Sequence, residues 1–213
     1  MLTTRVANKT PSKLQKLTKL AKIASVAKAA PDEIVRSARA PAPSPSSSRS
    51  PDLTHVDGSG AAHMVDVGPK AATARRAVAS ACVATTCEVV EVVVGARASK
   101  GDVLAAARIA GILAAKKTCE LIPLCHPVQT TRAAIAFEPN PAKGRIRVTA
   151  TVEAVDRTGV EMEALMAATV ASLTIYDMIK GVDRWASIET VRLEEKSGGK
   201  SGPLSRPQGG RGR

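Results

Sequence analysis

The chain of 213 residues carries a formal net charge of +12 and only three aromatic residues, so its core has to be built from small aliphatic side chains. Such a core buries little area per residue, and since burial contributes roughly 25 cal/mol per Å², we expect a marginal monomer that is stabilised by oligomerisation. The charge lies in the tails, because residues 61–195 hold 16 Lys and Arg against 15 Asp and Glu. A nearly neutral body argues against a broad basic face for nucleic-acid binding, although the tails could add a loose, salt-sensitive attraction to polyanions.

Residues 1–60 have lysines and apolar residues at roughly helical spacing, no acid before Asp32, and the Pro/Ser-rich stretch PAPSPSSSRSP. This composition is typical of an organellar transit peptide with a disordered linker; the alternative is a basic tail without an address. We therefore expect a disordered or transit-like extension over 1–60, a folded domain over 61–202 and a basic disordered tail over 203–213. The location would be the mitochondrial matrix in a eukaryote and the cytoplasm otherwise. No apolar run approaches the ~20 residues of a membrane span, so no membrane association is expected.

The four cysteines form no C-x-x-C pair. Structural zinc normally uses closely spaced pairs, and disulfide frameworks belong to small secreted domains. We expect no metal site and buried reduced thiols at Cys82, Cys87 and Cys119, while Cys125 stays open because of its neighbours.

The local sequence does not decide between helix and strand for the first two elements. Residues 75–84 are rich in alanine, as a helix is, yet their alanines alternate with other residues as in a strand. The Val-rich residues 86–94 are also undecided by propensity. Residues 100–118 predict a helix, because good helix formers follow an early Asp102 that suits the positive end of the helix dipole.

The later elements have clearer signals. Residues 128–137 and 145–155 alternate apolar with polar residues on either side of the turn-forming EPNPAKG, which predicts an antiparallel hairpin. Residues 160–179 predict a long helix that ends before Gly181. Residues 185–193 predict a last strand.

Three clusters place ionisable side chains among small apolar ones: LIPLCHP at 121–127, DRTGVEMEAL at 156–165 and TIYDMIK at 174–180. Core packing gives little reason for such clusters, so they indicate an active site. His126 stands between Pro123 and Pro127, whose rings restrict the backbone. A lone histidine is more often structural, although an imidazole can also donate to phosphate or shuttle a proton near neutral pH.

The long helix carries candidate groups at both ends. Glu161 and Glu163 begin it, where carboxylates are ordinarily dipole partners but also suit the N–H groups of a guanine-like ring. Asp177 and Lys180 share a helical face, and a surface ion pair is the alternative there. Glu163 and Asp177 lie roughly 21 Å apart at ~1.5 Å per residue. Either the substrate is extended or two subunits share the site, and we expect the second.

The segment KSGGKSG at 196–202 is not a Walker motif, because Glu194 occupies the place of the first glycine. A segment of Gly, Ser and Lys can nevertheless fold over phosphates. A solvated tail is the alternative.

Together with HMVDVGPK at 63–70 and KGDVLAAARIAGILAAKKT at 100–118, these strings resemble, in the same order, the cyclic pyranopterin monophosphate synthase family of molybdenum cofactor biosynthesis. The resemblance covers residues 63–202 and favours a strand at 75–84. The element order then becomes strand, helix, strand, strand, helix, strand. This is the α+β ferredoxin-like arrangement, an antiparallel sheet packed against two helices.

The resemblance implies a lyase that rearranges a cyclised dihydroguanosine triphosphate and releases diphosphate. The implied catalytic residues are Lys100, His126, Asp177 and Lys180. The candidate substrate-binding residues are Arg75, Lys116, Leu124, Cys125, His126, Glu161, Met162, Glu163 and Lys196. A catalytic lysine needs burial or a nearby cation to lower its pKa, and we expect Lys100, Lys180 and Lys116 to lie close enough for this.

The resemblance also implies no required cofactor, with magnesium carried at most by the triphosphate. It implies a homohexamer, a trimer of dimers with sites at the dimer interface. An RNA-recognition module has the same element order but stacks bases on sheet aromatics, and here the strands hold one Phe. An inactive structural relative is a second alternative, against which all four implied catalytic residues are present.

Overall fold

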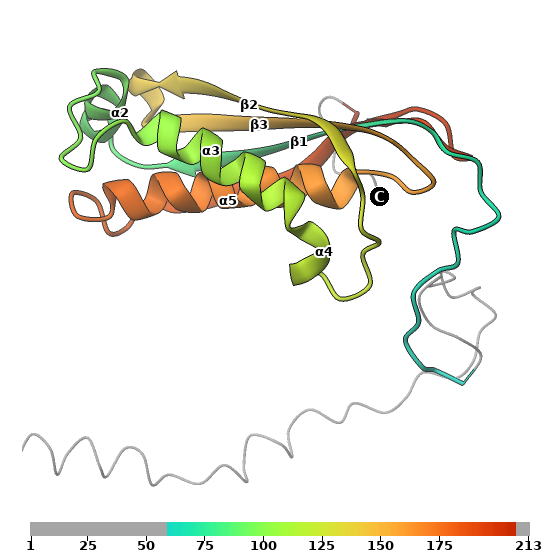
Figure 1. Cartoon of the computed structure of the whole chain (residues 1–213). Coiled ribbons are helices and arrows are strands. Elements are labelled where there is room, and N and C mark those ends of the chain that lie inside the picture. The colour runs from blue at the N-terminus through green and yellow to red at the C-terminus, as the bar shows by residue number, and fades with distance from the viewer. Residues whose placement is uncertain (1–58, 208–213) are drawn as a thin grey trace, which may run out of the picture. The chain divides into compact units, whose positions relative to one another are not determined.

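The computed structural model of the protein describes residues 59–207. The predicted N-terminal extension, apart from its last two residues, and the tail beyond residue 207 therefore lie outside the described residues. Figure 1 shows the described part as one sheet with its two long helices against one face and a short helix at one end.

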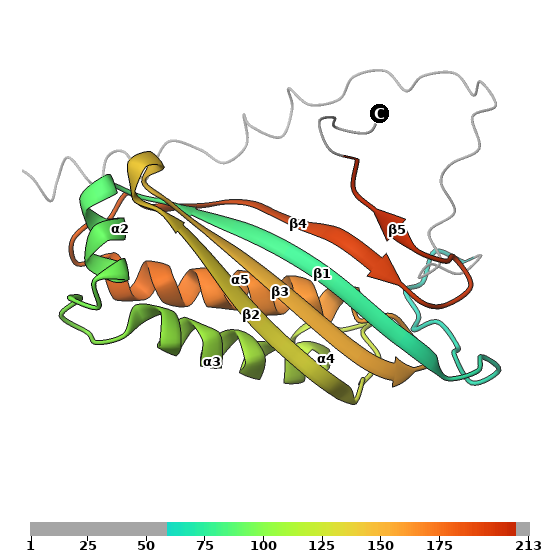
Figure 2. The same cartoon turned by 90° about the horizontal axis from the view of Figure 1, so that it is seen from above.

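Five strands form a single antiparallel sheet in the order β2-β3-β1-β4-β5. They are β1 (Thr73–Ala84), β2 (Thr130–Asn140), β3 (Arg145–Asp156), β4 (Ser187–Ser197) and β5 (Leu204–Ser205). The helices are α2 (Cys87–Val94), α3 (Val103–Lys116), α4 (Thr118–Leu121) and α5 (Glu161–Ile179), with a 3-10 turn, η1 (Pro141–Lys143), between β2 and β3. Figure 2 shows α3 and α5 side by side beneath the sheet.

This arrangement confirms the predicted α+β ferredoxin-like fold. Strand β1 lies between β3 and β4, and α3 and α5 provide the connections before β2 and β4. The strand interpretation of residues 75–84 is confirmed as part of β1, and the hairpin and both long helices lie where the sequence predicted them.

One detail was left undecided by the sequence, and three differ from the local predictions. Residues 87–94 form α2, in which the Thr86 side chain caps Val89 N while three valines are buried; β-branched residues tolerate a helix when its apolar face is packed. Thr118–Leu121 forms a separate α4. The last strand runs from Ser187 to Ser197 and so includes Lys196. Leu204 and Ser205 fall in the predicted disordered tail, but pairing with β4 places them in the sheet as β5.

Small side chains allow the helices to approach the sheet closely. The alanines of β1 at 77, 79 and 81 and those of α5 at 164, 167, 168 and 171 belong to one buried core. Gly111 marks a close approach of α3 to α5, since a Cβ there would stand 2.9 Å from the carbonyl oxygen of Ala167. The alanine content that left residues 75–84 ambiguous is thus explained by close packing of a helix on a strand.

The helical layer also leaves apolar side chains in solvent. Ile109 and Leu113, one turn apart on α3, are 60% and 51% exposed, and Leu173 on α5 is 51% exposed. By length and composition α5 alone, among the described helices, would suffice to cross a membrane. Because α5 packs on the sheet and has eight buried positions, it is the core helix of a folded domain, which passes the same test.

Candidate functional site

The N-terminus of α5 opens into a cavity of about 340 Å³. Two of the three clusters found in the sequence meet there, the LIPLCHP loop after α4 and the turn before α5. Twelve residues line the cavity: Val65, Val67, Lys70, Leu124, Cys125, His126, Val128, Thr158, Gly159, Glu161, Met162 and Glu163.

A second cavity of about 360 Å³ adjoins the first and shares Lys70, Thr158, Gly159 and Glu161 with it. Its other lining residues come from β1, from the turn before α5 and from the end of β4 and the loop after it. They are Arg75, Arg76, Arg157, Val160, Lys196, Ser197, Gly198, Lys200 and Ser201. We call the two cavities together the groove.

Glu163 is the most buried acid of the groove, with 3% of its surface exposed. Burial raises the pKa of its carboxyl to about 6, and the charges of Glu161 and Asp156 add to the rise, while a backbone hydrogen bond opposes it. A buried carboxylate without a cation is costly, so this position favours a ligand that donates hydrogen bonds or brings positive charge.

The LIPLCHP loop turns Cys125 and His126 into the same cavity. Burial raises the pKa of the Cys125 thiol, with further contributions from Glu163 and Cys119, so the thiol stays protonated and is no activated nucleophile. His126 Nε2 lies 2.7 Å from the carbonyl oxygen of Val65. A carbonyl only accepts, so Nε2 donates, which leaves Nδ1 for a ligand.

Arg75 is held at the other end of the groove. Its Nε and Nη2 donate to the carbonyl oxygens of Asp156 and Arg157 at 3.0 and 3.1 Å. Nearby, Lys196 Nζ lies 3.4 Å from Glu161 Oε1 and donates to Ser201 Oγ at 2.6 Å. Lys196 therefore links the loop after β4 to the first turn of α5.

Asp177, Lys100 and Lys180 form a separate cluster at the C-terminal end of α5. Lys180 Nζ lies 2.6 Å from Asp177 Oδ1, and Lys100 Nζ lies 3.3 Å from Oδ2 and 2.8 Å from the Asp177 carbonyl oxygen. The hydrogen bond from Lys180 and then that from Lys100 lower the pKa of Asp177, and Asp177 in turn raises the pKa of Lys180. We call these three residues the lysine cluster.

The expected grouping of three lysines is wrong within one chain. Lys116 ends α3, whereas Lys100 precedes its start, so the two are separated by roughly 20 Å of helix at ~1.5 Å per residue. Lys116 instead borders a depression with Gln129 and Thr130 at the start of β2. The pKa of Lys180 is raised and not lowered, because its nearest charged neighbour is a carboxylate.

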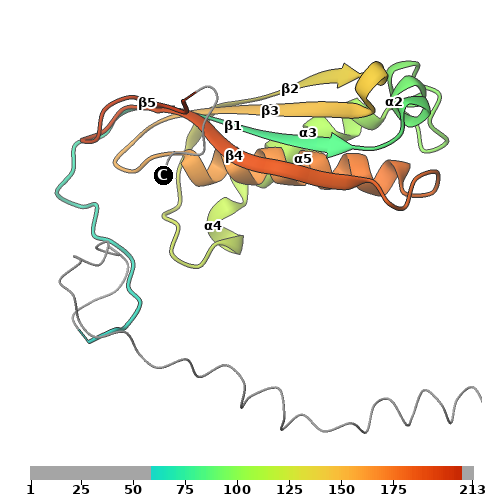
Figure 3. The ribbon, with the colours of Figure 1, turned by 180° about the vertical axis from the view of Figure 1, so that it is seen from behind.

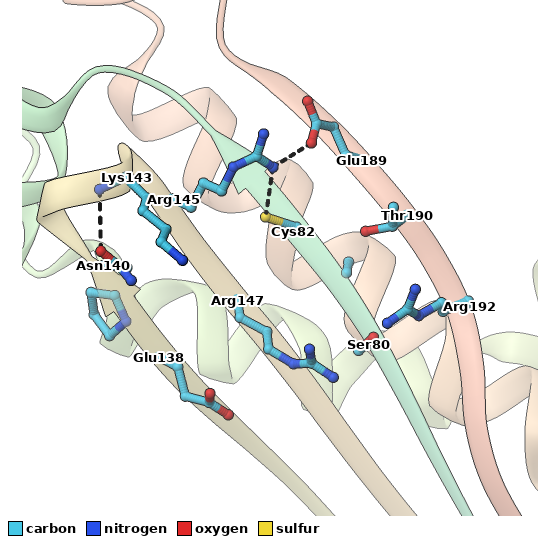
Figure 4. A pocket seen from close by; sticks show the side chains of 12 residues that line it. Ser80, Cys82, Glu138, Asn140, Lys143, Arg145, Arg147, Glu189, Thr190 and Arg192 are labelled. Atoms are coloured by element: carbon cyan, nitrogen blue, oxygen red, sulfur yellow. Dashed lines mark hydrogen bonds and ion pairs between the residues drawn. The ribbon is translucent and has the colours of Figure 1, made fainter. Parts of the chain in front are cut away.

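A further cavity of about 570 Å³ lies on β1 to β4 and contains none of the predicted site residues. Figure 4 shows Arg145 donating to Cys82 and Glu189 there, with Arg147 and Arg192 farther along the sheet. Among its lining residues, Ser80, Arg147 and Arg192 contact Glu194 of β4. These polar side chains thus largely satisfy one another.

The described residues offer no aromatic platform for stacking bases. Arg108 of α3 lies 5.3 Å from the centre of the Phe137 ring, and Phe137 packs partly buried against the core. The other two aromatics, Tyr176 in α5 and Trp185 before β4, lie outside the strands. This argues against the RNA-recognition alternative.

Comparison with known sequences identifies the family. The profile of the MoaC family matches residues 64–199. The chain belongs to the MoaC family. It is 51% identical over 157 residues to the cyclic pyranopterin monophosphate synthase of Chloroflexus aurantiacus, which covers 74% of this chain and 96% of that protein.

Two further relatives agree with this assignment. A cyclic pyranopterin monophosphate synthase of Herpetosiphon aurantiacus is 54% identical over 155 residues, 73% of this chain and 94% of that protein. Cyclic pyranopterin monophosphate synthase 3 of Mycobacterium bovis is 54% identical over 154 residues, 72% of this chain and 86% of that protein. This MoaC protein is thus a lyase of molybdenum cofactor biosynthesis.

The family's motifs are divided in space between the two ends of α5. Most of the candidate substrate-binding residues line the groove, together with His126, whereas Lys100, Asp177 and Lys180 lie at the far end. The sequence did not predict three further basic residues that line the groove, Lys70, Arg76 and Arg157, whereas Lys200 lies there within the predicted KSGGKSG segment. Lys70 lies within HMVDVGPK and Arg157 within DRTGVEMEAL. Their place in these motif strings could therefore have identified them as candidate site residues.

No group of three or more His, Cys, Asp or Glu side chains suited to holding a metal ion occurs within residues 59–207. The cysteines at 82, 87, 119 and 125 are free thiols. Cys87 is exposed and the other three are partly exposed, so the expectation of buried thiols is wrong. The reason is that they lie near element ends or on the open face of the sheet.

Proposed function

We propose that the groove of one subunit and the lysine cluster of another form one composite active site, and that this site carries out the cyclic pyranopterin monophosphate synthase reaction. The substrate would be (8S)-3',8-cyclo-7,8-dihydroguanosine 5'-triphosphate, and the products cyclic pyranopterin monophosphate and diphosphate. The observation that carries the proposal is the division of the family's motifs between the two ends of α5, a helix of 19 residues.

A two-fold axis across the helical layer would join the two halves. Antiparallel α5 helices in such an isologous dimer place the N-terminus of each beside the C-terminus of the other. The exposed apolar side chains of Ile109, Leu113 and Leu173 on α3 and α5 are the surface that such an interface would bury. Because a core almost free of aromatic side chains gives a marginal monomer, burying this surface in a dimer would stabilise the protein. A hexamer would then contain three such dimers.

The groove would bind the substrate at its two ends in different ways. The carboxylates of Glu163 and Glu161, beside Met162, would accept hydrogen bonds from the purine-derived ring. Arg75 and Lys196 would hold the triphosphate, since cations and loop N–H groups bind phosphate oxygens. Leu124 would contact the ring, with Lys70 and Arg157 as further groove cations.

The lysine cluster would move protons. Lys100 and Lys180 would act as general acid and base while the purine five-membered ring opens and the pyranopterin forms, and Asp177 would orient both. His126, when protonated on both ring nitrogens, would donate from Nδ1 to phosphate charge as diphosphate leaves. Cations of the facing groove would repel the ammonium group of Lys180 and so oppose the rise in its pKa that Asp177 causes.

The proposed reaction uses no bound cofactor. Magnesium would enter with the triphosphate, whose charge it neutralises. Lys116 would contribute only by facing a second subunit. The relatives named above are bacterial, which favours the cytoplasmic alternative for this chain over the mitochondrial one.

The direct test incubates purified full-length protein with the enzymatically prepared cyclic triphosphate, oxidises the product and detects the fluorescent pterin. We expect product from the wild type and from Lys117→Ala, an exposed lysine next to α3, and at least a hundredfold less from Lys100→Ala. No pterin from the folded wild-type protein would refute the proposed reaction. Equal rates for both variants would refute the role of Lys100.

A further inference from the structure

We propose that the C-terminal segment Leu204–Arg206 is a strap that holds the loop of residues 197–203 over the groove, with Arg206 as a positioning residue for the substrate's phosphates. The inference rests on the proposed function, because it assigns the phosphates to this end of the groove. It concerns residues that the sequence pattern assigned to a disordered tail.

The strap closes a hairpin. Glu195 pairs with Ser205, and Lys196 pairs with Leu204. Between these pairs the chain turns through residues 197–203, where Gly202 N donates to Gly199 O at 3.2 Å. Figure 3 shows β5 beside the end of β4, so the loop is tied to the sheet at both of its ends.

Arg206 fastens the far end of this hairpin. Its backbone N–H donates to the carbonyl oxygen of Glu194 at 2.8 Å, and its Nε donates to the carbonyl oxygen of Leu193 at 2.9 Å. The same Nε lies 3.6 Å from Glu194 Oε2. Three contacts thus connect a residue beyond β5 to two consecutive residues of β4.

The side chain of Glu194 is itself held by contacts with three strands. Its side chain is 16% exposed and contacts Arg147 of β3 at 3.1 Å, Arg192 of β4 at 2.9 Å and the Ser80 hydroxyl of β1. Burial opposes ionisation, but hydrogen bonds from Ser80 and Arg192 outweigh it and lower the pKa of the Glu194 carboxyl. The ionised carboxylate therefore joins three strands and the strap.

The loop is supported from the other side by β1. A Cβ at Gly198 would overlap the carbonyl oxygen of Ala74, and one at Gly199 would overlap Arg75 Nη1. Both glycines have positive φ, 91° and 79°, a region that L side chains rarely adopt. The loop therefore lies directly against β1, and it brings Lys200 and Ser201 into the lining of the groove.

Tethering at both ends lowers the cost of ordering this loop. A free C-terminal segment would have to lose backbone and side-chain freedom when it closes on phosphates, whereas the strapped loop has lost most of that freedom on folding. The effect should appear in substrate binding and not in the chemical step, because neither the strap nor the loop contains a residue to which proton transfer is assigned.

Two truncated proteins test the strap. One ends after Pro203 and lacks the strap; the matched control ends after Pro207 and keeps it. We expect KM for the cyclic triphosphate to rise about tenfold in the shorter protein, with kcat within about twofold of the control. Arg206→Ala should raise KM to a smaller extent, and Arg206→Lys should recover part of the loss, because an ammonium still reaches the Leu193 carbonyl.

A second readout does not need turnover. The rate of tryptic cleavage after Lys200 should rise severalfold in the protein that ends after Pro203, and the calorimetric Kd of inorganic pyrophosphate should rise with KM. Equal KM values and equal cleavage rates for the two truncations would overturn the strap. A fall in kcat with unchanged KM would also overturn it. The full-length protein could be inactive while the protein that ends after Pro203 still binds pyrophosphate more weakly than its control. That outcome would refute the proposed function and support the strap.

Discussion

The carboxylate of Asp177 bridges the ammonium groups of Lys180 and Lys100, at 2.6 and 3.3 Å. Asp177 lies in the last turn of α5, Lys180 caps the end of that helix, and Lys100 reaches them from the loop before α3. All three side chains are about half exposed, so the cluster contributes little to the stability of one chain. Its arrangement instead holds two lysines at a fixed separation on the surface.

Asp177→Asn should shift the titration of Lys180 to lower pH. Asp177 stabilises the protonated lysine by a hydrogen bond and by charge, which raises its pKa, so removal of the carboxylate removes that stabilisation. NMR titration of the lysine side chains, labelled with ¹³C at Cε, measures the shift, and Lys117 serves as the internal reference. An unchanged Lys180 titration would show that the ion pair is not formed in solution.

Subunit mixing tests the composite site. Asp177→Ala damages one half-site and Glu163→Ala the other, so a mixed dimer has one site with both lesions and one with neither. After subunit exchange at equal amounts, about one quarter of wild-type activity should return, since half of the dimers are mixed and each keeps one of two sites. Mixed oligomers verified by affinity tags that stay inactive would mean that one chain builds each site.

Glu163→Gln should stabilise the protein near neutral pH. The folded-state pKa of Glu163 is raised from 4.5 to about 6, so the folded state binds the proton more tightly than the unfolded state. Wild-type stability therefore falls as pH rises from about 4.5 to 6. At 1.36 kcal/mol per pKa unit the penalty approaches roughly 2 kcal/mol at pH 7.

Chemical denaturation between pH 4 and 8 measures this difference. The advantage of the Gln variant should shrink as pH falls through 6 and vanish below about 4.5. Glu120→Gln, at an exposed position on α4, is the matched control. A Gln variant that is less stable at pH 7 would show that Glu163 has a charged partner there.

Gly111→Ala should destabilise the protein although alanine is the better helix former. Alanine would gain about 1 kcal/mol in propensity, but its Cβ would stand 2.9 Å from Ala167 O and 3.2 Å from Ala171 Cβ. Overpacking of this kind costs typically 1–3 kcal/mol, so we expect a lower melting temperature. Gly181→Ala, where nothing lies within 4 Å of the added Cβ, should leave it nearly unchanged. Equal melting temperatures for Gly111→Ala and the wild type would mean that α3 and α5 can move apart at little cost.

The sequence by itself determined the features that depend on neighbouring residues. The periodicity of α5, the turn between β2 and β3 and the helix that starts after Asp102 are local signals, and each lies where it was predicted. The ordered motif strings were specific enough to give the family, and the spacing of Glu163 and Asp177 on one helix already placed the candidate residues at two distant ends.

Only the tertiary structure decided the features that depend on distant residues. The alternating alanines of β1 suit either a strand or a helix until α5 packs on them, and the valines of α2 form a helix because Val89, Val90 and Val93 are buried. Leu204 and Ser205 became a strand by pairing with β4. Strand pairing and burial depend on contacts between residues far apart in the chain. Their contribution to stability therefore cannot be judged from any short segment of the sequence.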